Sequence, residues 1–385
     1  MKKLTHTFFF SLLFSFGLQA QTHNSFHQTL VDQVNQPTIQ TNLTAFANFG
    51  TKEMGTNAQA NAFQWLKDLY QSWGYTSVEQ QAITVWGKTG YNLIVTKQGT
   101  VYPNTYIIID GHYDTYHGPG ANDNGSGTSI ILEMARILKD IPTEYSIKFI
   151  HFTAEEVGLV GSQRYVDQIV LPQNLDIKLV FNIDQVGGVA GEINDTITCE
   201  RDQSSPNSNN AQSATVTNEL RTLMGLYSSL ETVLGPAYGS DYEPFQEEGF
   251  VITGLYETNE SPYPHTSQDT LDHVDFDFIF QVAKGTMGAL CYFAKAYNTM
   301  DVNEVSQVNI QVYPNPADNS IEIKSPIGGS AKIQLLDFNG KLIHSKEFSG
   351  NETQLSTTHI PNGVYVLNYS NGDLKANQKI IIQHK

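Results

Sequence analysis

The sequence has few cysteines and few basic residues for its length. Only Cys199 and Cys291 occur among 385 residues, and neither lies in a metal-binding or nucleophile motif. They could form one disulfide in an oxidising compartment, but Cys291 falls in an apolar helical pattern that fits a buried free thiol at least as well. Lys and Arg number 22 against 39 Asp and Glu, which gives a net charge of -17. This balance argues against a nucleic-acid surface and against binding to anionic membranes.

Long apolar runs are also scarce, and the clearest one lies at the N-terminus. Lys2 and Lys3 precede the run Phe8–Leu18, and Ala20 follows it. This order is typical of a signal peptide, so we expect residues 1–20 to be removed. The run is short for a bilayer span, and no other stretch predicts a transmembrane segment. An exported protein without a membrane span is therefore expected.

Residues 21–38 are polar and weakly patterned, and they predict an N-terminal arm or a pro-segment. Residues 39–299 then alternate between strand and helix patterns, which predicts an α/β domain. Its sheet should be mixed and mostly parallel, with helices on both faces. Strands are expected at Val78–Trp86, Tyr91–Val95, Tyr106–Ile109, Ile147–Phe152, Ile177–Ile183 and Phe250–Leu255. Helices are expected at Asn61–Tyr75, Thr128–Lys139, Ser162–Ile169, Asn218–Leu230 and Phe276–Tyr297, and Gln203–Ala214 should be a loop.

The pattern of predicted secondary structure changes after residue 300. Residues 300–308 are polar and predict a linker, and residues 309–385 contain short strand patterns. Asn339-Gly340 and Asn371-Gly372 are strong signals for tight turns between strands. A small all-β sandwich is therefore expected as a second domain. No cluster of titratable residues in it suggests catalysis.

Histidine and acidic side chains follow several predicted strands of the α/β domain, at the points where those strands end. They are His112, Asp114 and Asp123 after Tyr106–Ile109, Glu155 and Glu156 after Ile147–Phe152, Asp184 after Ile177–Ile183, and His265 after Phe250–Leu255. A parallel sheet would bring them to one edge. Mixed imidazole and carboxylate ligands suit zinc or a similar divalent ion. A set of two histidines, two aspartates and one glutamate, with a second glutamate to spare, has too many ligands for one catalytic zinc. Such a set of five fits two metals if one carboxylate bridges them.

Each feature also has a structural explanation when it is taken alone. The run from Asn122 to Gly125 could be only a turn and a helix cap, and Glu155-Glu156 could be solvated charge. A single histidine after a strand is more often structural than a ligand. Five such features at strand ends of one sheet favour the metal centre.

These residues lie in motifs that resemble the M28 family of zinc aminopeptidases. The resemblance covers roughly Phe49 to Tyr297. The motifs are Gly111-His112-Tyr113-Asp114-Thr115, Gly120-Ala121-Asn122-Asp123-Asn124-Gly125-Ser126-Gly127, Thr153-Ala154-Glu155-Glu156, Asn182-Ile183-Asp184, Gly239-Ser240-Asp241 and His265-Thr266 with Asp269-Thr270. The resemblance implies the fold of the zinc exopeptidases.

The resemblance also implies a role for each residue. His112 and Asp184 are implied to bind one zinc ion, Glu156 and His265 the other, and Asp123 to bridge the two. Glu155 is implied to be the general base, and Asp114 to orient the ring of His112 by a hydrogen bond. The family often has a cis peptide here, between Asp123 and Asn124. It commonly has His where this chain has Tyr242, whose hydroxyl could still donate to the substrate.

The terminal β module resembles the C-terminal sorting domain of type IX secretion systems. The similarity lies in Val312-Tyr313-Pro314-Asn315-Pro316-Ala317, in Leu336-Asp337-Phe338-Asn339-Gly340-Lys341 and in Gly363-Val364-Tyr365. It implies that the type IX machinery is a partner and that the protein is secreted or held at the cell surface. A binding module for carbohydrate or for a protein partner is the alternative.

The expected protein is a secreted aminopeptidase with two zinc ions, which hydrolyses the N-terminal peptide bond of a peptide substrate. The nearest alternatives are a carboxypeptidase or dipeptidase of the M28 type and a glutaminyl-cyclase-like enzyme with one zinc. A metal-bound but inactive surface protein is the alternative from another class. The complete ligand set and the presence of Glu155 argue against that last reading.

Overall fold

The computed structural model describes residues 23–298, 310–325, 328–337, 341–371 and 374–384. The chain divides into two compact units after Asn298. The predicted signal peptide and the predicted linker lie outside the described residues. None of the described helices is long and apolar enough to cross a membrane.

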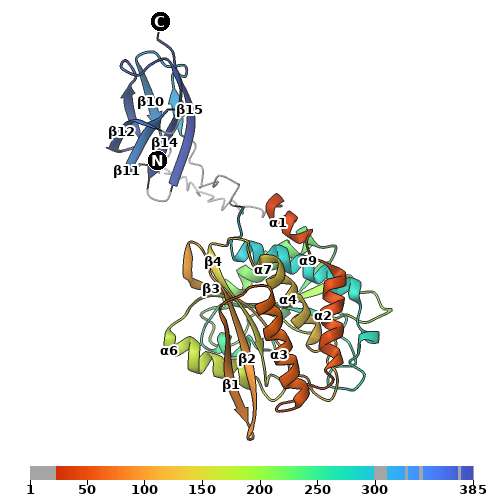
Figure 1. Cartoon of the computed structure of the whole chain (residues 1–385). Helices are drawn as coiled ribbons and strands as arrows, with labels where there is room; N and C mark the ends of the chain where they lie inside the picture. The colour runs from red at the N-terminus through yellow and green to blue at the C-terminus, as the bar shows by residue number, and fades with distance from the viewer. Residues whose placement is uncertain (1–22, 299–309, 326–327, 338–340, 372–373, 385) are drawn as a thin grey trace, which may run out of the picture. The chain divides into compact units, whose positions relative to one another are not determined.

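An eight-stranded mixed sheet runs through the first unit (Figure 1). Its strands are β1 (Val78–Val85), β2 (Lys88–Lys97), β3 (Tyr102–His112), β4 (Tyr145–Phe152), β5 (Asp176–Ile183), β6 (Thr196–Arg201), β7 (Glu231–Pro236) and β8 (Ile252–Glu257), in the order β1-β2-β4-β3-β5-β8-β6-β7. The central strands β4, β3, β5 and β8 are parallel, so their carboxyl ends share one edge. Strand β2 runs antiparallel to β4, and β6 runs antiparallel to β8. The predicted strands are thus confirmed, but β6 and β7 were not foreseen.

Helices cover both faces of the sheet, as predicted. One face packs against α3 (Asn57–Ser72), α4 (Gly125–Leu138), α7 (Asn210–Tyr227) and α9 (Phe276–Phe293). The other packs against α5 (Val160–Tyr165), the π-helix η1 (Val166–Val170) and α8 (Glu243–Glu247). Alternate side chains of one strand serve the two faces: Ile107 and Ile109 belong to the first core, and Ile108 to the second.

The N-terminal arm is part of the folded unit. It forms α1 (Ser25–Val31) and the start of α2 (Gln36–Asn48), which continues past the predicted boundary at residue 38, and each helix is capped by an asparagine side chain. Leu30, Val31 and Phe46 are buried in the main core. The short, polar helices carry too few apolar residues to be recognised by periodicity, and their stability comes from packing on the domain.

Two further predictions are settled by the same unit. Helix α7 begins at Asn210, inside the predicted loop, because packing on β6 and β8 overrides a loop-like composition. Cys199 and Cys291 are buried free thiols, so the disulfide alternative is wrong.

The second unit is a small sandwich of two antiparallel sheets around its own core, as predicted. One sheet has the order β13-β10-β9 and the other β12-β11-β14-β15. The strands are β9 (Gln311–Tyr313), β10 (Ser320–Lys324), β11 (Ser330–Leu336), β12 (Leu342–Ser349), β13 (Glu352–Ser356), β14 (Gly363–Asn371) and β15 (Leu374–Ile382), of which β13 and β15 were not foreseen.

Candidate metal centre

The seven strand-end residues singled out in the sequence lie at the carboxyl edge of the sheet. His112 ends β3, and Asp123 stands two residues before α4. Asp184 directly follows β5, and His265 lies in the segment between β8 and α9. The remaining three are Asp114, just after β3, and Glu155 and Glu156, in the turn after β4.

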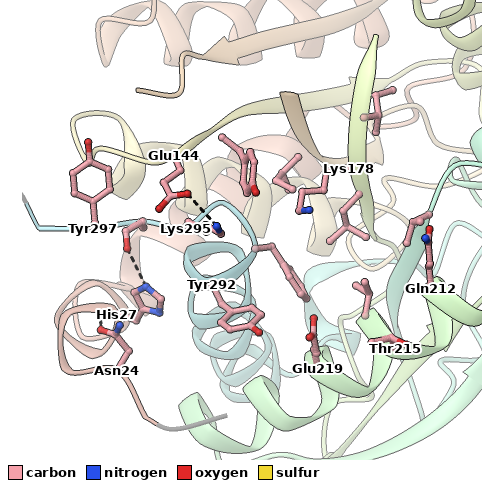
Figure 2. Close-up of a pocket in the computed structure, with 18 residues that line it drawn as sticks. Asn24, His27, Glu144, Lys178, Gln212, Thr215, Glu219, Tyr292, Lys295 and Tyr297 are labelled. Carbon is pink, nitrogen blue, oxygen red and sulfur yellow. Dashed lines mark hydrogen bonds and ion pairs between the residues drawn. The ribbon is translucent and has the colours of Figure 1, made fainter. Parts of the chain in front are cut away.

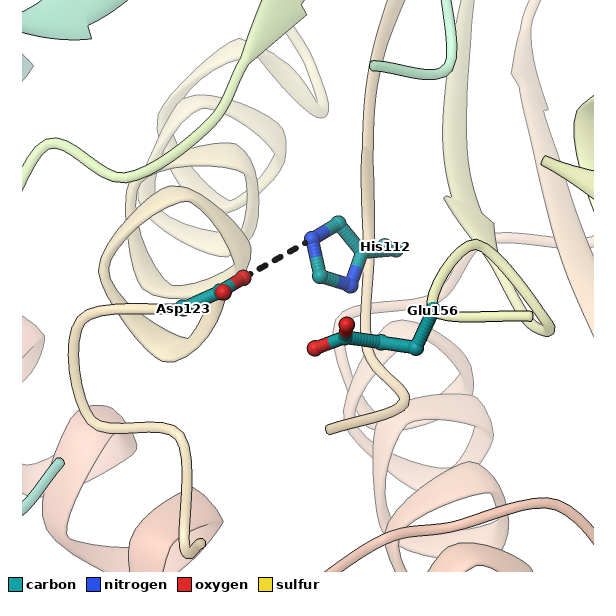
Figure 3. A group of neighbouring side chains, drawn as sticks. All are labelled: His112, Asp123 and Glu156. Atoms are coloured by element: carbon teal, nitrogen blue, oxygen red, sulfur yellow. Dashed lines mark ion pairs between the residues drawn. The ribbon is translucent and has the colours of Figure 1, made fainter. Parts of the chain in front are cut away.

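Asp123 lies close to both His112 and His265, and Figure 3 shows its carboxylate beside His112 and Glu156. Its Oδ1 lies 3.2 Å from His112 Nε2, and its Oδ2 lies 3.2 Å from His265 Nε2. On one side, Asp184 Oδ1 lies 3.3 Å from His112 Nε2. On the other, Glu156 Oε2 lies 2.8 Å from His265 Nε2. The five side chains therefore form two sets that share one carboxylate.

Close packing of α4 against β5 holds Asp123 beside Asp184. A Cβ atom at Gly127 would collide with the carbonyl oxygen of Ile183, so glycine is required at this position. Asn124 caps α4 by accepting from the Gly127 N–H, and its amide donates to the Ile183 carbonyl at 2.8 Å. The Asp123–Asn124 peptide bond is cis, as the family resemblance implied.

The carboxylate of Asp269 supports the backbone of the same turn. Its two oxygens accept from the backbone N–H groups of Asn122, at 2.7 Å, and of Asp123, at 3.0 Å. Asp269 is itself buried. It therefore fixes the backbone that carries the shared ligand.

Asp114 orients His112 in a different way from the one predicted. His112 Nδ1 lies 3.0 Å from the backbone oxygen of Asp114, whereas the Asp114 carboxylate is 3.8 Å away. That carboxylate instead accepts from the backbone N–H groups of Glu155 and Glu156, at 3.3 and 3.4 Å. Asp114 thus positions the histidine through its main chain and the two glutamates through its side chain.

Three residues at this edge have a left-handed backbone, which is unfavourable for a side chain with a Cβ. They are Ala154, with φ 58°, Gln185, with φ 47°, and His265, with φ 59°. The first two are next to Glu155 and Asp184 in the chain. Strained backbone of this kind is retained where the surrounding structure requires a particular side-chain direction.

Negative charge is not balanced at this edge. Burial raises the pKa of Glu155 well above its usual range, and the nearby Asp241 and Asp184 add to the effect. The close Asp123 and Glu156 carboxylates, which accept from the His265 ring, raise the pKa of His265 to about 10. Buried oxygens of Asp123, Glu156 and Asp184 have no hydrogen-bond partner of good geometry. Bound cations would satisfy these oxygens, and the mixture of histidine and carboxylate suits zinc.

Tyr242 has a different partner from the one predicted. It is fully buried, and its hydroxyl donates to Glu200 Oε2 at 2.8 Å and accepts from the Tyr238 N–H at 2.9 Å. Its proton is therefore committed to Glu200 and is not directed at the five ligands. Ser240, two residues before Tyr242, donates to Asp184 Oδ2 at 2.7 Å and so supports a potential ligand.

Sequence reasoning missed a cavity of about 510 Å³ that begins at Asp184. Glu200 is part of its wall, at the end of the unforeseen strand β6. A weak signal was available, because the run Thr196–Arg201 alternates polar and apolar residues over its first five positions and carries an acidic residue, Glu200, near its end. Its short length, before a polar loop, concealed it.

A larger cavity of about 900 Å³ lies at the other edge of the sheet (Figure 2). Residues at the starts of β4 and β5 and at the end of α9 line it, so it is remote from the ligands. Two of its charged or ionisable groups are paired: Glu144 Oε2 lies 3.1 Å from Lys295 Nζ, and His27 Nε2 lies 3.1 Å from the Ala296 carbonyl. No ligand predicted from the sequence lies there.

Comparison with known proteins places this arrangement in a family. The family model for Peptidase family M28 matches residues 92–289, about half of the chain and the part that contains all five potential ligands. The chain belongs to peptidase family M28. The second unit matches the secretion system C-terminal sorting domain over residues 311–383.

Curated relatives of the M28 domain include two aminopeptidases. Aminopeptidase YwaD of Bacillus subtilis is 36% identical over 194 residues, which are 49% of this chain and 41% of the relative. The chain thus spans less than half of that relative's length. Leucine aminopeptidase 1 of Ajellomyces capsulatus is 27% identical over 296 residues, 69% of this chain and 73% of the relative.

A solved structure supports the fold. The LapA aminopeptidase of Legionella pneumophila superposes with a TM-score of 0.62 and 23% sequence identity, covering 77% of this chain and 81% of that one. At this identity the similarity establishes the fold of the M28 domain and no finer property.

Proposed function

We propose that the M28 domain is an aminopeptidase that holds two zinc ions and removes N-terminal residues from peptides. The observation that carries the proposal is the division of five ligands into two sets, His112 with Asp184 and His265 with Glu156, which share Asp123. Two-metal hydrolytic sites use a bridging ligand in this way. The named aminopeptidase relatives support the choice of reaction.

Glu155 is the residue that we assign as general base. Its Oε2 lies 4.0 Å from His112 Nε2, beside the ligands, and its side chain is only 12% exposed. Burial raises its pKa, so the carboxylate accepts a proton more readily than one in water. When zinc is bound, it supplies Lewis acidity and a water of lowered pKa. Glu155 takes a proton from the attacking water and later gives it to the leaving amine as the C–N bond breaks.

The same edge explains a preference for a free N-terminus. A substrate's α-ammonium group is attracted to the excess of carboxylates around Asp123 and Asp184, where buried oxygens lack partners. A blocked amine loses this attraction and adds bulk. An exopeptidase that acts from the N-terminus is the result.

The decisive experiment compares chromogenic amino-acid amides with free and with blocked α-amines, using enzyme with and without a chelator. We expect cleavage of the free amines only, abolished by the chelator and restored by zinc. Cleavage of blocked substrates instead would favour a carboxypeptidase or an endopeptidase. Absence of cleavage, with cyclisation of N-terminal glutamine, would favour the cyclase reading, and absence of both would favour an inactive metal-bound protein.

For the second unit we propose the role of an export label read by the type IX machinery. The match to a secretion sorting domain over residues 311–383 supports this role. It gives a secreted or surface-held enzyme, with the peptidase domain in residues 39–299, a linker in 300–308 and the label in 309–385. Deletion of residues 309–385 should leave the peptidase inside the producing cell, and unchanged export of that variant would refute the role.

A further inference from the structure

The cavity beside Asp184 continues away from the metal centre along β6 and β8. Its volume of about 510 Å³ exceeds what an α-ammonium group needs and is sufficient for a long side chain. Thr198 and Glu200 line it from alternate positions of β6, so both side chains face the same way. A residue bound at the metals thus has room for its side chain here.

Glu200 is one of several buried polar groups in this wall. It is 7% exposed, and its Oε2 accepts from the Tyr242 hydroxyl at 2.8 Å. Its other oxygen has no hydrogen-bond partner among the described residues. A Cβ atom at Gly254 would lie 2.7 Å from both Glu200 Oε2 and Tyr242 Cε1, so glycine leaves the room that this pair occupies.

The remaining charges of the wall are also negative. Glu257 is engaged by the Asn122 amide and by the backbone N–H groups of Ser261 and Gly188, so it serves the fold. Glu260 is exposed at the lining. None of the described lining residues is basic. A cation that enters the cavity therefore meets the carboxylates of Glu200 and Glu260 with no basic side chain of the lining to compete for them.

Apolar surface accompanies these carboxylates. The ring of Tyr238 is 84% exposed, and Tyr256 and Pro236 also line the cavity. The aliphatic stem of Lys or Arg packs well on such surfaces while its charged head reaches a carboxylate, and aromatic faces attract cations.

We propose that this cavity binds the side chain of the substrate's N-terminal residue and that Glu200 selects a basic side chain, Lys or Arg. The inference rests on the proposed aminopeptidase function and adds its substrate class. A cationic ligand pairs with the Glu200 oxygen that Tyr242 does not engage. Burial and the nearby Asp184 raise the pKa of Glu200 to about 8, and a bound cation offsets that cost of ionisation.

The first test uses the zinc-loaded wild-type enzyme and pairs of p-nitroanilides that differ in charge and little in shape. Arginine is compared with citrulline, and lysine with norleucine. We expect kcat/KM for each basic substrate to exceed that of its neutral partner by about tenfold or more, as a charge-assisted hydrogen bond in a desolvated site gives. Equal values, or a preference for citrulline and norleucine, would overturn the inference.

The second test is Glu200→Gln, whose amide oxygen can still accept from Tyr242. The arginine-to-citrulline ratio should fall to within about twofold of one. Glu231→Gln is the matched control, because Glu231 is exposed at the start of β7 and does not line the cavity. It should keep the wild-type ratio. A ratio that survives in Glu200→Gln would remove Glu200 as the selecting group.

These outcomes separate this inference from the proposed function. Zinc-dependent cleavage of free amines with a preference for apolar residues would retain the aminopeptidase and overturn only the basic specificity. If the enzyme cleaved none of the four substrates and no other amino-acid amide with a free α-amine, both the aminopeptidase function and the basic specificity would be overturned.

Discussion

The two edges of the large sheet contain similar side chains and differ in how their charges are matched. At the carboxyl edge, five ligands and Glu155 crowd together, and several buried oxygens have no partner. At the opposite edge, Glu144 pairs with Lys295 and His27 with a carbonyl group. The larger cavity belongs to the second edge. Buried charge without a partner, and not cavity size, distinguishes the edge at which chemistry is proposed.

The largest effect should come from removal of the shared carboxylate. In Asp123→Ala, bound zinc should fall below two ions per chain, because both sets of ligands lose a member. Turnover should fall by more than about 10⁴-fold, beyond the usual cost of losing a general base. Elemental analysis and kcat measurements check this. A variant that still held two zinc ions would refute the bridging role.

Removal of the base should separate chemistry from metal binding. Glu155→Ala should keep both zinc ions and lose about 10²- to 10⁴-fold in kcat, because no other carboxylate stands in its place. The readouts are single-substrate kinetics and metal content measured on the same sample. Wild-type turnover in this variant would exclude Glu155 as the base.

The pKa of the histidine inside the sheet, His151, is shifted in the opposite direction to that of His265 at the metal edge. His151 is fully buried, and its Nδ1 has no partner, so burial lowers its pKa to about 3. The unfolded chain, with a pKa near 6.5, then binds more protons between about pH 3 and 6.5. Stability is lost as pH falls through this window, by about 2 kcal/mol at pH 5.

Denaturant unfolding at pH 8 and pH 5 measures this loss. His151→Gln removes the titrating ring and keeps an acceptor for the Tyr70 hydroxyl, so it should reduce the loss by about that amount. His344→Gln, at an exposed position of the second unit, is the control and should lose as much stability between pH 8 and pH 5 as the wild type. If all three proteins lost the same free energy of unfolding between pH 8 and pH 5, His151 would not be the group that titrates.

The smallest effect is expected at the edge with paired charges. Glu144→Gln breaks the pair with Lys295, whose side chains are 33% and 50% exposed. Such pairs contribute at most about 1 kcal/mol, so thermal stability should barely change. Amidase activity should match that of the wild type. A loss of activity comparable to that of Glu155→Ala would contradict the contrast between the two edges.

The parts of this molecule that sequence predicts well are those whose signal is local. Strands β3, β4 and β5 each contain a short apolar stretch, and a proposed ligand stands at the last residue of β3, four residues after β4 and directly after β5. Parallel pairing then brings the ligands together without any further information. The ligand positions were therefore accessible from the sequence, with the fold as the only intermediate.

The parts that sequence predicts poorly depend on distant partners. Helices α1 and α2 are held by burial of residues such as Leu30 and Phe46 against the rest of the domain. The proton of Tyr242 goes to Glu200, on a strand whose position in the sheet no local pattern indicates. The Asp114 carboxylate turns to backbone N–H groups of another loop. These contacts join residues that are distant in the sequence, so they exist only in the folded chain.

The spread of the ligands along the chain has a consequence for how the enzyme matures. The five residues lie at or after the ends of β3, β4 and β5, in the turn before α4 and in the segment between β8 and α9, from position 112 to position 265. No short segment contains a complete set, so an unfolded chain has no site of comparable affinity. Under the proposed function, zinc binds only after the sheet has formed, and its binding free energy adds directly to the stability of the folded form. Metal supply and resistance to unfolding are thus linked quantities in this protein.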